Sequence, residues 1–203
     1  MITSKDMSNI YFWFDTEFTS LDLNTARLLQ VAIIPTNAKL ERVLPPEEDL
    51  NLFVHIGSGQ NISPWVRENL PDLIKHCRSE TLTSAATVNR TIGIWLEKNF
   101  GLKRDDISKR PLLAGNSLQC DWYMARKFLP TLIEYTHYRM LDVSSWKVHW
   151  LNSGRGDPFD KATPELTDKH LPFARRGEGA SHDAYFDVQA SIAEFNYYIE
   201  KMG

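Results

Sequence analysis

The residues of this chain with the clearest chemical potential are four carboxylic acids and one histidine: Asp15, Glu17, Asp121, His182 and Asp187. Two divalent cations held about 4 Å apart need several hard oxygen ligands, which carboxylates supply. A neutral imidazole beside them can accept a proton from a water molecule. If the five side chains meet in one pocket, they predict a site that uses two divalent cations to hydrolyse a phosphodiester bond.

The first two acids follow a short apolar and aromatic run, Ile10–Phe14, which is typical of a buried strand. Residues i and i+2 of a strand project from the same face, so Asp15 and Glu17 would point into one site. Burial penalises unpaired carboxylates, and coordination of a metal ion offsets that penalty. The alternative is a strand that ends in solvent with two exposed acids, which is the more common meaning of Asp-x-Glu taken alone.

The other three residues depend on where helices begin. A Gly-Asn-Ser turn at 115–117 would place Asp121 at the carboxyl end of the sheet, where open α/β sheets bind ligands. His182 and Asp187 would diverge by roughly 140° on one continuous helix. They can share a site only if His182 lies in the loop before a helix and Asp187 lies one turn inside it. Otherwise Asp121 is an acid stabilised at a helix start and His182 is a surface histidine.

Apolar patterns predict the elements that must position these residues. Five strands are expected, over Ile10–Phe14, Leu28–Ile34, Leu50–Ile56, Pro111–Ala114 and Arg139–Val143. Helices are expected from about Pro64, across residues 82–100, 121–128 and 144–151, and in a final segment capped by Ser181. The first helix would bury Trp65, and the last would turn Ile199 inward. This order favours an α/β fold with a mixed five-stranded sheet flanked by helices.

Length and composition bound the class of protein. A chain of 203 residues with 42% hydrophobic residues suits one domain over residues 1–203 with a substantial core. Disorder is expected only at residues 1–9, and a mobile surface loop is expected over 152–180, which is rich in glycine, proline and charge. The net charge of −3 argues against extended binding to duplex nucleic acid and favours short substrates with few phosphates.

Cysteine content and hydropathy bear on the compartment. The two cysteines, Cys77 and Cys120, form no disulfide framework, which is typical of a reducing compartment. The first residues match no signal peptide, and no apolar run reaches the roughly 18 residues of a membrane span. The sequence therefore predicts a soluble, cytoplasmic protein with no membrane partner, and it leaves an organellar location open.

Four motifs together resemble those of the DEDDh 3′–5′ exonuclease superfamily, which has a ribonuclease H-like fold, and more narrowly those of oligoribonuclease. Asp-x-Glu followed by Thr-x-Leu-Asp stands at 15–22, Gly-Asn-Ser with a later aspartate stands at 115–121, and His-x-Ala-x-x-Asp stands at 182–187. The stretch His-Tyr-Arg-Met-Leu-Asp-Val-Ser at 137–144 matches the oligoribonuclease pattern almost letter for letter. The narrower resemblance rests mainly on that stretch, and the whole covers about Ile10 to Tyr198.

The resemblance implies a role for each candidate residue. The residues that would hold two Mg²⁺ or Mn²⁺ ions are Asp15, Glu17, Asp121 and Asp187, and His182 would be the general base. Leu21 would wedge between the terminal bases, and Trp65 would stack on a base. The residues that would bind the 5′-phosphate of a short RNA are Ser117, Arg139 and Ser144, with Tyr138 contributed by the partner subunit of a homodimer.

The implied activity is that of an enzyme, a 3′–5′ exoribonuclease that degrades di- to pentanucleotides to nucleoside 5′-monophosphates. One alternative is an exonuclease of the same superfamily that trims longer single-stranded DNA or RNA, as a tRNA-end trimmer or a proofreading subunit does. Another is a binding module that has kept the fold and lost the chemistry. The chain departs from the family at Ser20 and Phe186, and its segments near 69–74 and 154–179 are expanded. These departures bear on substrate length more than on the chemistry.

Overall fold

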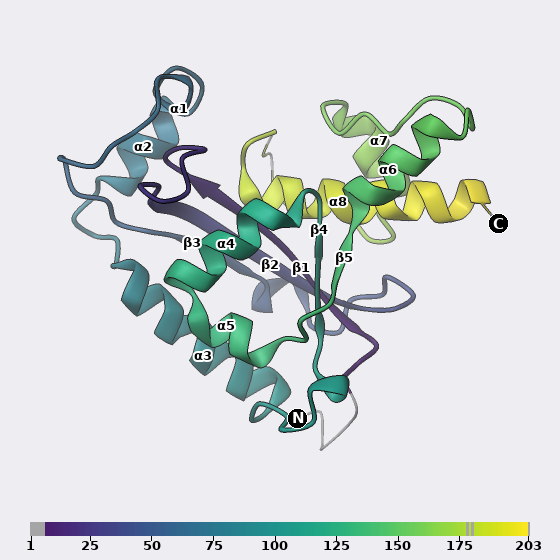
Figure 1. Ribbon diagram of the computed structural model, residues 1–203, viewed down its shortest axis with the longest axis horizontal. Coiled ribbons are helices and arrows are strands. Elements are labelled where there is room, and N and C mark those ends of the chain that lie inside the picture. The colour runs from purple at the N-terminus through teal and green to yellow at the C-terminus, as the bar shows by residue number, and fades with distance from the viewer. Residues whose placement is uncertain (1–6, 178, 180, 203) are drawn as a thin grey trace.

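The computed structural model describes residues 7–177, 179 and 181–202, and a five-stranded sheet runs through its centre (Figure 1). The strands are β1 (Ile10–Phe18), β2 (Leu28–Asn37), β3 (Leu50–Phe53), β4 (Leu112–Gly115) and β5 (Met140–Asp142). Their order across the sheet is β3-β2-β1-β4-β5. Strand β2 is antiparallel to β1 and β3, whereas β4 is parallel to β1 and β5. The mixed five-stranded sheet expected from the sequence is therefore confirmed.

One face of the sheet is covered by α3 (Ala85–Phe100), α4 (Leu118–Phe128) and α5 (Pro130–Tyr135). The alternation of side chains along β1 directs Phe12 and Phe14 to this face, and both are buried there. The ring centroid of Phe12 lies 5.0 Å from that of Phe100 and 5.9 Å from that of Trp95. Large aromatic side chains stabilise such a core because each removes a large apolar area from water.

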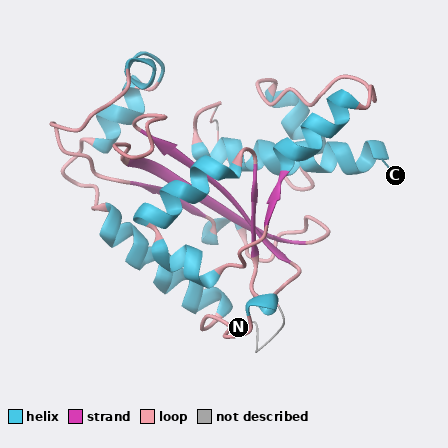
Figure 2. Cartoon of the chain, viewed as in Figure 1, coloured by secondary structure: helices cyan, strands magenta, loops and turns pink. Residues whose placement is uncertain are grey.

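The opposite face is covered by α6 (Val143–Asn152), α7 (Pro164–His170) and α8 (Ala184–Met202), and Figure 2 shows helices on either side of the strands. Trp13 of β1 points to this face, and its ring centroid lies 5.8 Å from that of Phe195 in α8. Its indole N–H donates to Thr36 Oγ1 at 2.8 Å, so burial leaves no donor unpaired. Asp15 and Glu17 continue the alternation of Trp13 and therefore project on the α8 face of the sheet.

Helices α1 (Pro64–Asn69) and α2 (Pro71–Cys77) form a smaller apolar cluster with Leu29 of β2. Ser63 caps α1, because its Oγ accepts the backbone N–H of Val66 at 3.2 Å. Two short 3-10 helices, Pro46–Glu48 and Ile107–Lys109, lie in connecting segments. None of the helices in the part of the chain that the structure describes has the length and apolar character needed to cross a bilayer.

Three short helices, α2, α5 and α7, were not expected from the sequence. Each begins with a proline in its first turn and spans only six or seven residues, which is too short to display helical periodicity. Helix α7 lies inside residues 152–180, expected as a loop, and Phe159 of the same segment is buried. At the N-terminus Met7 is buried and donates its backbone N–H to Lys109, although residues 1–9 were expected to be disordered; residues 1–6 lie outside the described part.

Some side-chain orientations and boundaries also differ from the sequence prediction. Trp65 is 49% exposed, because the inward side of α1 is taken by its neighbour Val66. Ile199 is exposed rather than inward-facing. The cap of α8 is Asp183, not Ser181: Asp183 Oδ1 accepts the N–H of Phe186 at 2.9 Å. Strand β3 ends at Phe53, three residues before the end that was expected.

Candidate active site

Strand β1 supplies the first two carboxylates. Asp15 and Glu17 lie near its carboxyl end, beside an irregularity in the pairing with β2 between Glu17 and Phe18. Both side chains are partly buried on the α8 face of the sheet. Strand β4 is parallel to β1, so its carboxyl end lies at the same end of the sheet. The residues that follow β4 are therefore close to Asp15 and Glu17.

Helix α4 supplies the third carboxylate, that of Asp121. Thr16, which lies between Asp15 and Glu17 in β1, holds it by hydrogen bonds. Asp121 is buried in the first turn of α4, and its Oδ1 accepts both the backbone N–H of Thr16 at 2.9 Å and the Thr16 hydroxyl at 2.6 Å. The approach of α4 to β1 requires a glycine at the end of β4, because a Cβ at Gly115 would lie 2.7 Å from the Phe14 carbonyl oxygen. In the sequence Thr16 is only the variable residue of Asp-x-Glu, so nothing there predicts this role.

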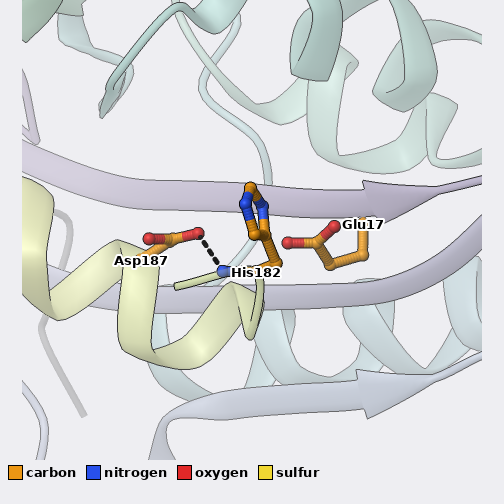
Figure 3. A group of neighbouring side chains, drawn as sticks. All are labelled: Glu17, His182 and Asp187. Atoms are coloured by element: carbon orange, nitrogen blue, oxygen red, sulfur yellow. Dashed lines mark hydrogen bonds between the residues drawn. The ribbon is translucent and has the colours of Figure 1, made fainter. Parts of the chain in front are cut away.

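The start of α8 supplies the histidine and the fourth carboxylate, as the spacing required. His182 lies in the loop before the helix and Asp187 lies in its first turn (Figure 3). The backbone N–H of His182 donates to Asp187 Oδ2 at 3.0 Å. His182 adopts φ +71, a left-handed conformation that is uncommon outside glycine and that this bond helps to hold. One possible ligand atom from each of Glu17, His182 and Asp187 lies within 4.8 Å of the others.

A lysine that the sequence analysis did not single out also enters the cluster. Lys161 comes from the segment between α6 and α7, and its Nζ lies 3.1 Å from Asp187 Oδ1. Residues 152–180 have the composition of a surface loop, and a lysine in a charged loop carries no sequence signal that distinguishes it from a surface lysine. Burial alone would lower the pKa of Lys161, but Asp187, Asp15 and Glu17 together raise it above its ordinary value.

Burial, and then mutual repulsion, raises the pKa of three of the carboxylates. Burial, followed by repulsion from Asp187 and Asp121, raises the pKa of Glu17 to about 8. Burial raises the pKa of Asp121 to about 6 in spite of the two hydrogen bonds from Thr16. Burial and then repulsion from Asp121, Asp187 and Glu17 also raise the pKa of Asp15 well above its usual range. The negative charge of four converging acids exceeds the positive charge of the one ammonium group beside them. Their carboxylate oxygens are suitable ligands for hard divalent cations, which would balance that charge.

The five predicted residues line a single cleft of about 740 Å³. Leu21 and Trp65 also line it and are 83% and 49% exposed, so both present apolar surface to a bound molecule. The Trp65 ring lies edge-to-face against the His182 ring, with centroids 5.0 Å apart. Exposed rings and aliphatic side chains beside such a cleft can stack on nucleotide bases.

The Gly-Asn-Ser turn after β4 forms a polar wall of the cleft. Ser117 lines the cleft with φ 52, and its backbone N–H donates to Ser144 Oγ at 2.8 Å and to Asp142 Oδ1 at 3.2 Å. The hydroxyls of Ser117 and Ser144 are 3.0 Å apart. Asn116 completes the network, with its Oδ1 accepting from Ser144 Oγ at 3.2 Å and its Nδ2 donating to Glu194 at 2.9 Å. The structure therefore brings together two of the predicted phosphate-binding residues.

Tyr138 and Arg139 lie away from the cleft of their own chain. Both precede the edge strand β5, and neither is among the residues that line the cleft. Tyr138 is 65% exposed, and the Arg139 guanidinium lies 5.7 Å from the centroid of its ring. The structure thus brings the five chemical residues, Leu21, Trp65 and Ser117 to one cleft. Ser144 does not line the cleft but is hydrogen-bonded to Ser117, whereas Tyr138 and Arg139 are exposed beside the edge strand.

Comparison with known proteins agrees with this geometry. A family model described as exonuclease matches residues 12–195. The chain is similar to oligoribonuclease from Shewanella loihica, with 28% identity and 98% of each chain covered. It is similar to oligoribonuclease from Francisella tularensis subsp. tularensis, with 25% identity and 94% of each chain covered.

A solved structure of Pop2p from S. pombe, in its Mg²⁺- and Mn²⁺-bound form, has a similar fold. The TM-score is 0.63 at 12% sequence identity, and the match covers 92% of this chain and 81% of that one. At this identity the likeness concerns the fold alone, and it agrees with the mixed sheet and flanking helices described above.

Proposed function

The chain belongs to the exonuclease family, and on that basis we propose that it is a metal-dependent 3′–5′ exoribonuclease that degrades di- to pentanucleotides to nucleoside 5′-monophosphates. The observation that carries the proposal is the convergence of Asp15, Glu17, Asp121, His182 and Asp187 in one cleft. A structural cluster of acids would be destabilising without a compensating role, because burial and mutual repulsion oppose the ionisation of Asp15, Glu17 and Asp121.

Two divalent cations, Mg²⁺ or Mn²⁺, would be held by Asp15, Glu17, Asp121 and Asp187. When bound, they would supply the Lewis-acid chemistry of the reaction, which is activation of a water molecule and stabilisation of the leaving 3′-oxygen. Thr16 fixes the orientation of the Asp121 carboxylate through two hydrogen bonds to Oδ1. The other oxygen, Oδ2, would then be available to a cation.

His182 would accept the proton of the attacking water. Its imidazole is exposed beside Glu17 and Asp187, whereas its backbone N–H is engaged by Asp187 Oδ2, so the ring is free to face the substrate (Figure 3). The Trp65 ring against its edge restricts where the imidazole can turn. General-base catalysis of this kind contributes about 10²- to 10⁴-fold to a rate.

The substrate would lie between the apolar and polar walls of the cleft. Leu21 and Trp65 would contact bases, and Ser117 and Ser144 would bind the 5′-phosphate through their paired hydroxyls. Arg139 would complete the phosphate site, and Tyr138 would reach it from the partner subunit of a homodimer; both side chains are exposed in the single chain. A charged cap on the terminal phosphate would limit the substrate to a few nucleotides. The free thiols of Cys77 and Cys120 fit a cytoplasmic setting.

The alternative exonuclease of longer single strands is separated by substrate length. We expect the rate on 5′-labelled RNAs from two to about twenty nucleotides, with Mg²⁺ or Mn²⁺, to fall steeply beyond about five nucleotides, since the phosphate cap blocks the path of a longer chain. EDTA should abolish the activity. Equal rates across all lengths would favour the trimming alternative, and no cleavage of any RNA would contradict the proposed function.

A further inference from the structure

We propose that Lys161 competes with a divalent cation for Asp187, so that an ion reaches this carboxylate only when the lysine withdraws. The inference rests on the proposed metal-dependent function and adds a residue that sets how tightly the site takes its ions. Lys161 lies in the segment between α6 and α7, outside the motifs that support the proposed function.

Both carboxylate oxygens of Asp187 are engaged in the structure. Oδ1 lies 3.1 Å from Lys161 Nζ, and Oδ2 accepts the backbone N–H of His182 at 3.0 Å. The side chain of Asp187 is only 6% exposed, so most of its surface is in contact with neighbouring residues. A cation bound to Asp187 Oδ1 would lie close to the Lys161 ammonium group, which contacts the same oxygen. The two positive charges would repel each other.

The backbone on both sides of Lys161 is held in place by contacts of its neighbours. Phe159 anchors the segment in the core, and Asp160 ties the residues that follow the lysine: its Oδ1 accepts the N–H of Ala162 at 3.0 Å and its Oδ2 accepts the Thr163 hydroxyl at 2.8 Å. Helix α7 then begins at Pro164. The lysine side chain is 40% exposed and flexible, so the ammonium group can leave Asp187 for the cleft while its backbone stays in place.

This arrangement predicts opposite effects on the metal-free and the metal-bound protein. In the metal-free protein Lys161 offsets part of the repulsion among the carboxylates, and its loss should lower the melting temperature. In the metal-bound protein the same charge opposes the ion, and its loss should tighten binding by about tenfold, the order expected for a nearby like charge partly screened by water. A lysine with a merely structural role would move both quantities in the same direction.

The test is a calorimetric titration of MnCl₂ alone into the metal-free full-length protein, paired with thermal unfolding in EDTA and in excess Mn²⁺. Lys161→Met keeps the length of the stem and removes the charge, whereas Lys161→Arg keeps the charge. Lys169→Met, an exposed lysine of α7, is the matched control. We expect tighter Mn²⁺ binding and a lower melting temperature in EDTA for Lys161→Met, and wild-type values for Lys161→Arg and Lys169→Met.

The outcomes separate the inference from the function beneath it. Equal or weaker Mn²⁺ affinity in Lys161→Met, with binding intact in the wild type, overturns the competition and leaves the metal-dependent function standing. Absence of Mn²⁺ binding in both proteins overturns both. Binding in Lys161→Met where the wild type binds weakly or not at all supports the competition in its strongest form.

Discussion

Thr16 and Asp187 show how single residues organise the cluster. Thr16 points away from its neighbours in β1, yet its N–H and hydroxyl both donate to Asp121 Oδ1 and so join the strand to α4. Asp187 joins α8 to two neighbouring segments. One carboxylate oxygen accepts the backbone N–H of His182, in the loop before the helix, and the other contacts the Lys161 ammonium group. The geometry of the candidate site therefore depends on hydrogen bonds to carboxylates, both within the start of α8 and between residues that lie 26 or 105 positions apart.

At this scale the sharpest prediction concerns His182. We expect His182→Ala to keep its affinity for Mn²⁺, since four carboxylates remain, and to lose about 10²- to 10⁴-fold in turnover, since the proton acceptor is gone. Mn²⁺ titration and initial rates on a short RNA measure the two quantities. His149→Ala, an exposed histidine of α6, should change neither. A His182→Ala variant with near-wild-type turnover would remove the histidine from the proposed chemistry.

At the scale of elements, the start of α8 couples stability to the site. Asp183 caps the helix through the N–H of Phe186 and lies between His182 and Asp187. We expect Asp183→Ala to lower the free energy of unfolding by about 1 kcal/mol and to reduce activity as well, because loss of the cap loosens the turn that places both residues. Urea unfolding and RNA cleavage rates measure the two effects.

Ser84→Ala is the matched control for that experiment. Ser84 caps α3 through the N–H of Thr87, at a helix that supplies none of the cleft residues. It should cost a similar amount of stability, about 1 kcal/mol, and leave the cleavage rate of the folded protein unchanged. Equal activity in the two variants would show that the turn before α8 is positioned by other contacts.

The elements predicted from the sequence are those with a long or strongly apolar pattern. All five strands and the long helices α3 and α8 were anticipated, because several buried side chains recur in each at the spacing of its geometry. The short helices α2, α5 and α7 were missed, since one or two turns after a proline look like a loop. Trp65 was expected inside, because a single apolar residue does not reveal which side of a six-residue helix it occupies.

The residues of the candidate site also divide into those that could be predicted from the sequence and those that could not. The spacing of His182 and Asp187 was enough to predict a histidine before the helix and an aspartate one turn inside it, because helix geometry permits no other convergence. Lys161 and Thr16 could not be predicted, because their contacts cross 26 and 105 positions of the chain and depend on how separate elements pack. The ligand roles and the homodimer remain proposals.

At the scale of the whole molecule, the fold buries mutually repelling acids at the end of a stable sheet. Membership of an exonuclease family, expected from the motifs, is confirmed by the match over residues 12–195. The two apolar clusters on either face of β1 hold the strand that carries Asp15 and Glu17, so the stability of the core offsets the cost of the charged site. That cost should be visible in the pH dependence of folding.

We expect the free energy of unfolding in EDTA to fall as the pH rises from about 4.5 to about 8. Glu17 has a pKa of about 8 in the folded protein against 4.5 as its ordinary value, and Asp121 about 6 against 3.8. Between these values the folded state binds more protons than the unfolded state, so raising the pH favours unfolding. Urea unfolding across this range measures the fall, expected to be on the order of a few kcal/mol.

Glu17→Gln should flatten the profile, because the amide does not titrate, and excess Mn²⁺ should do so in the wild type by favouring the ionised carboxylates. Glu165→Gln, in the first turn of α7 and exposed, should leave the slope as it is. A wild-type profile in EDTA that is flat or rises over this range would argue against mutual repulsion among the buried acids.

The most direct test of the central claim is the rate at which a 5′-labelled RNA pentamer is shortened from its 3′ end in Mn²⁺ by Asp15→Asn, by Asp187→Asn and by the double variant. If β1 and α8 contribute ligands to one catalytic unit, each single variant should lose roughly 10³-fold or more, and the double variant should be almost no slower than either. Near-wild-type rates in a single variant, or losses that multiply in the double variant, would contradict a shared site.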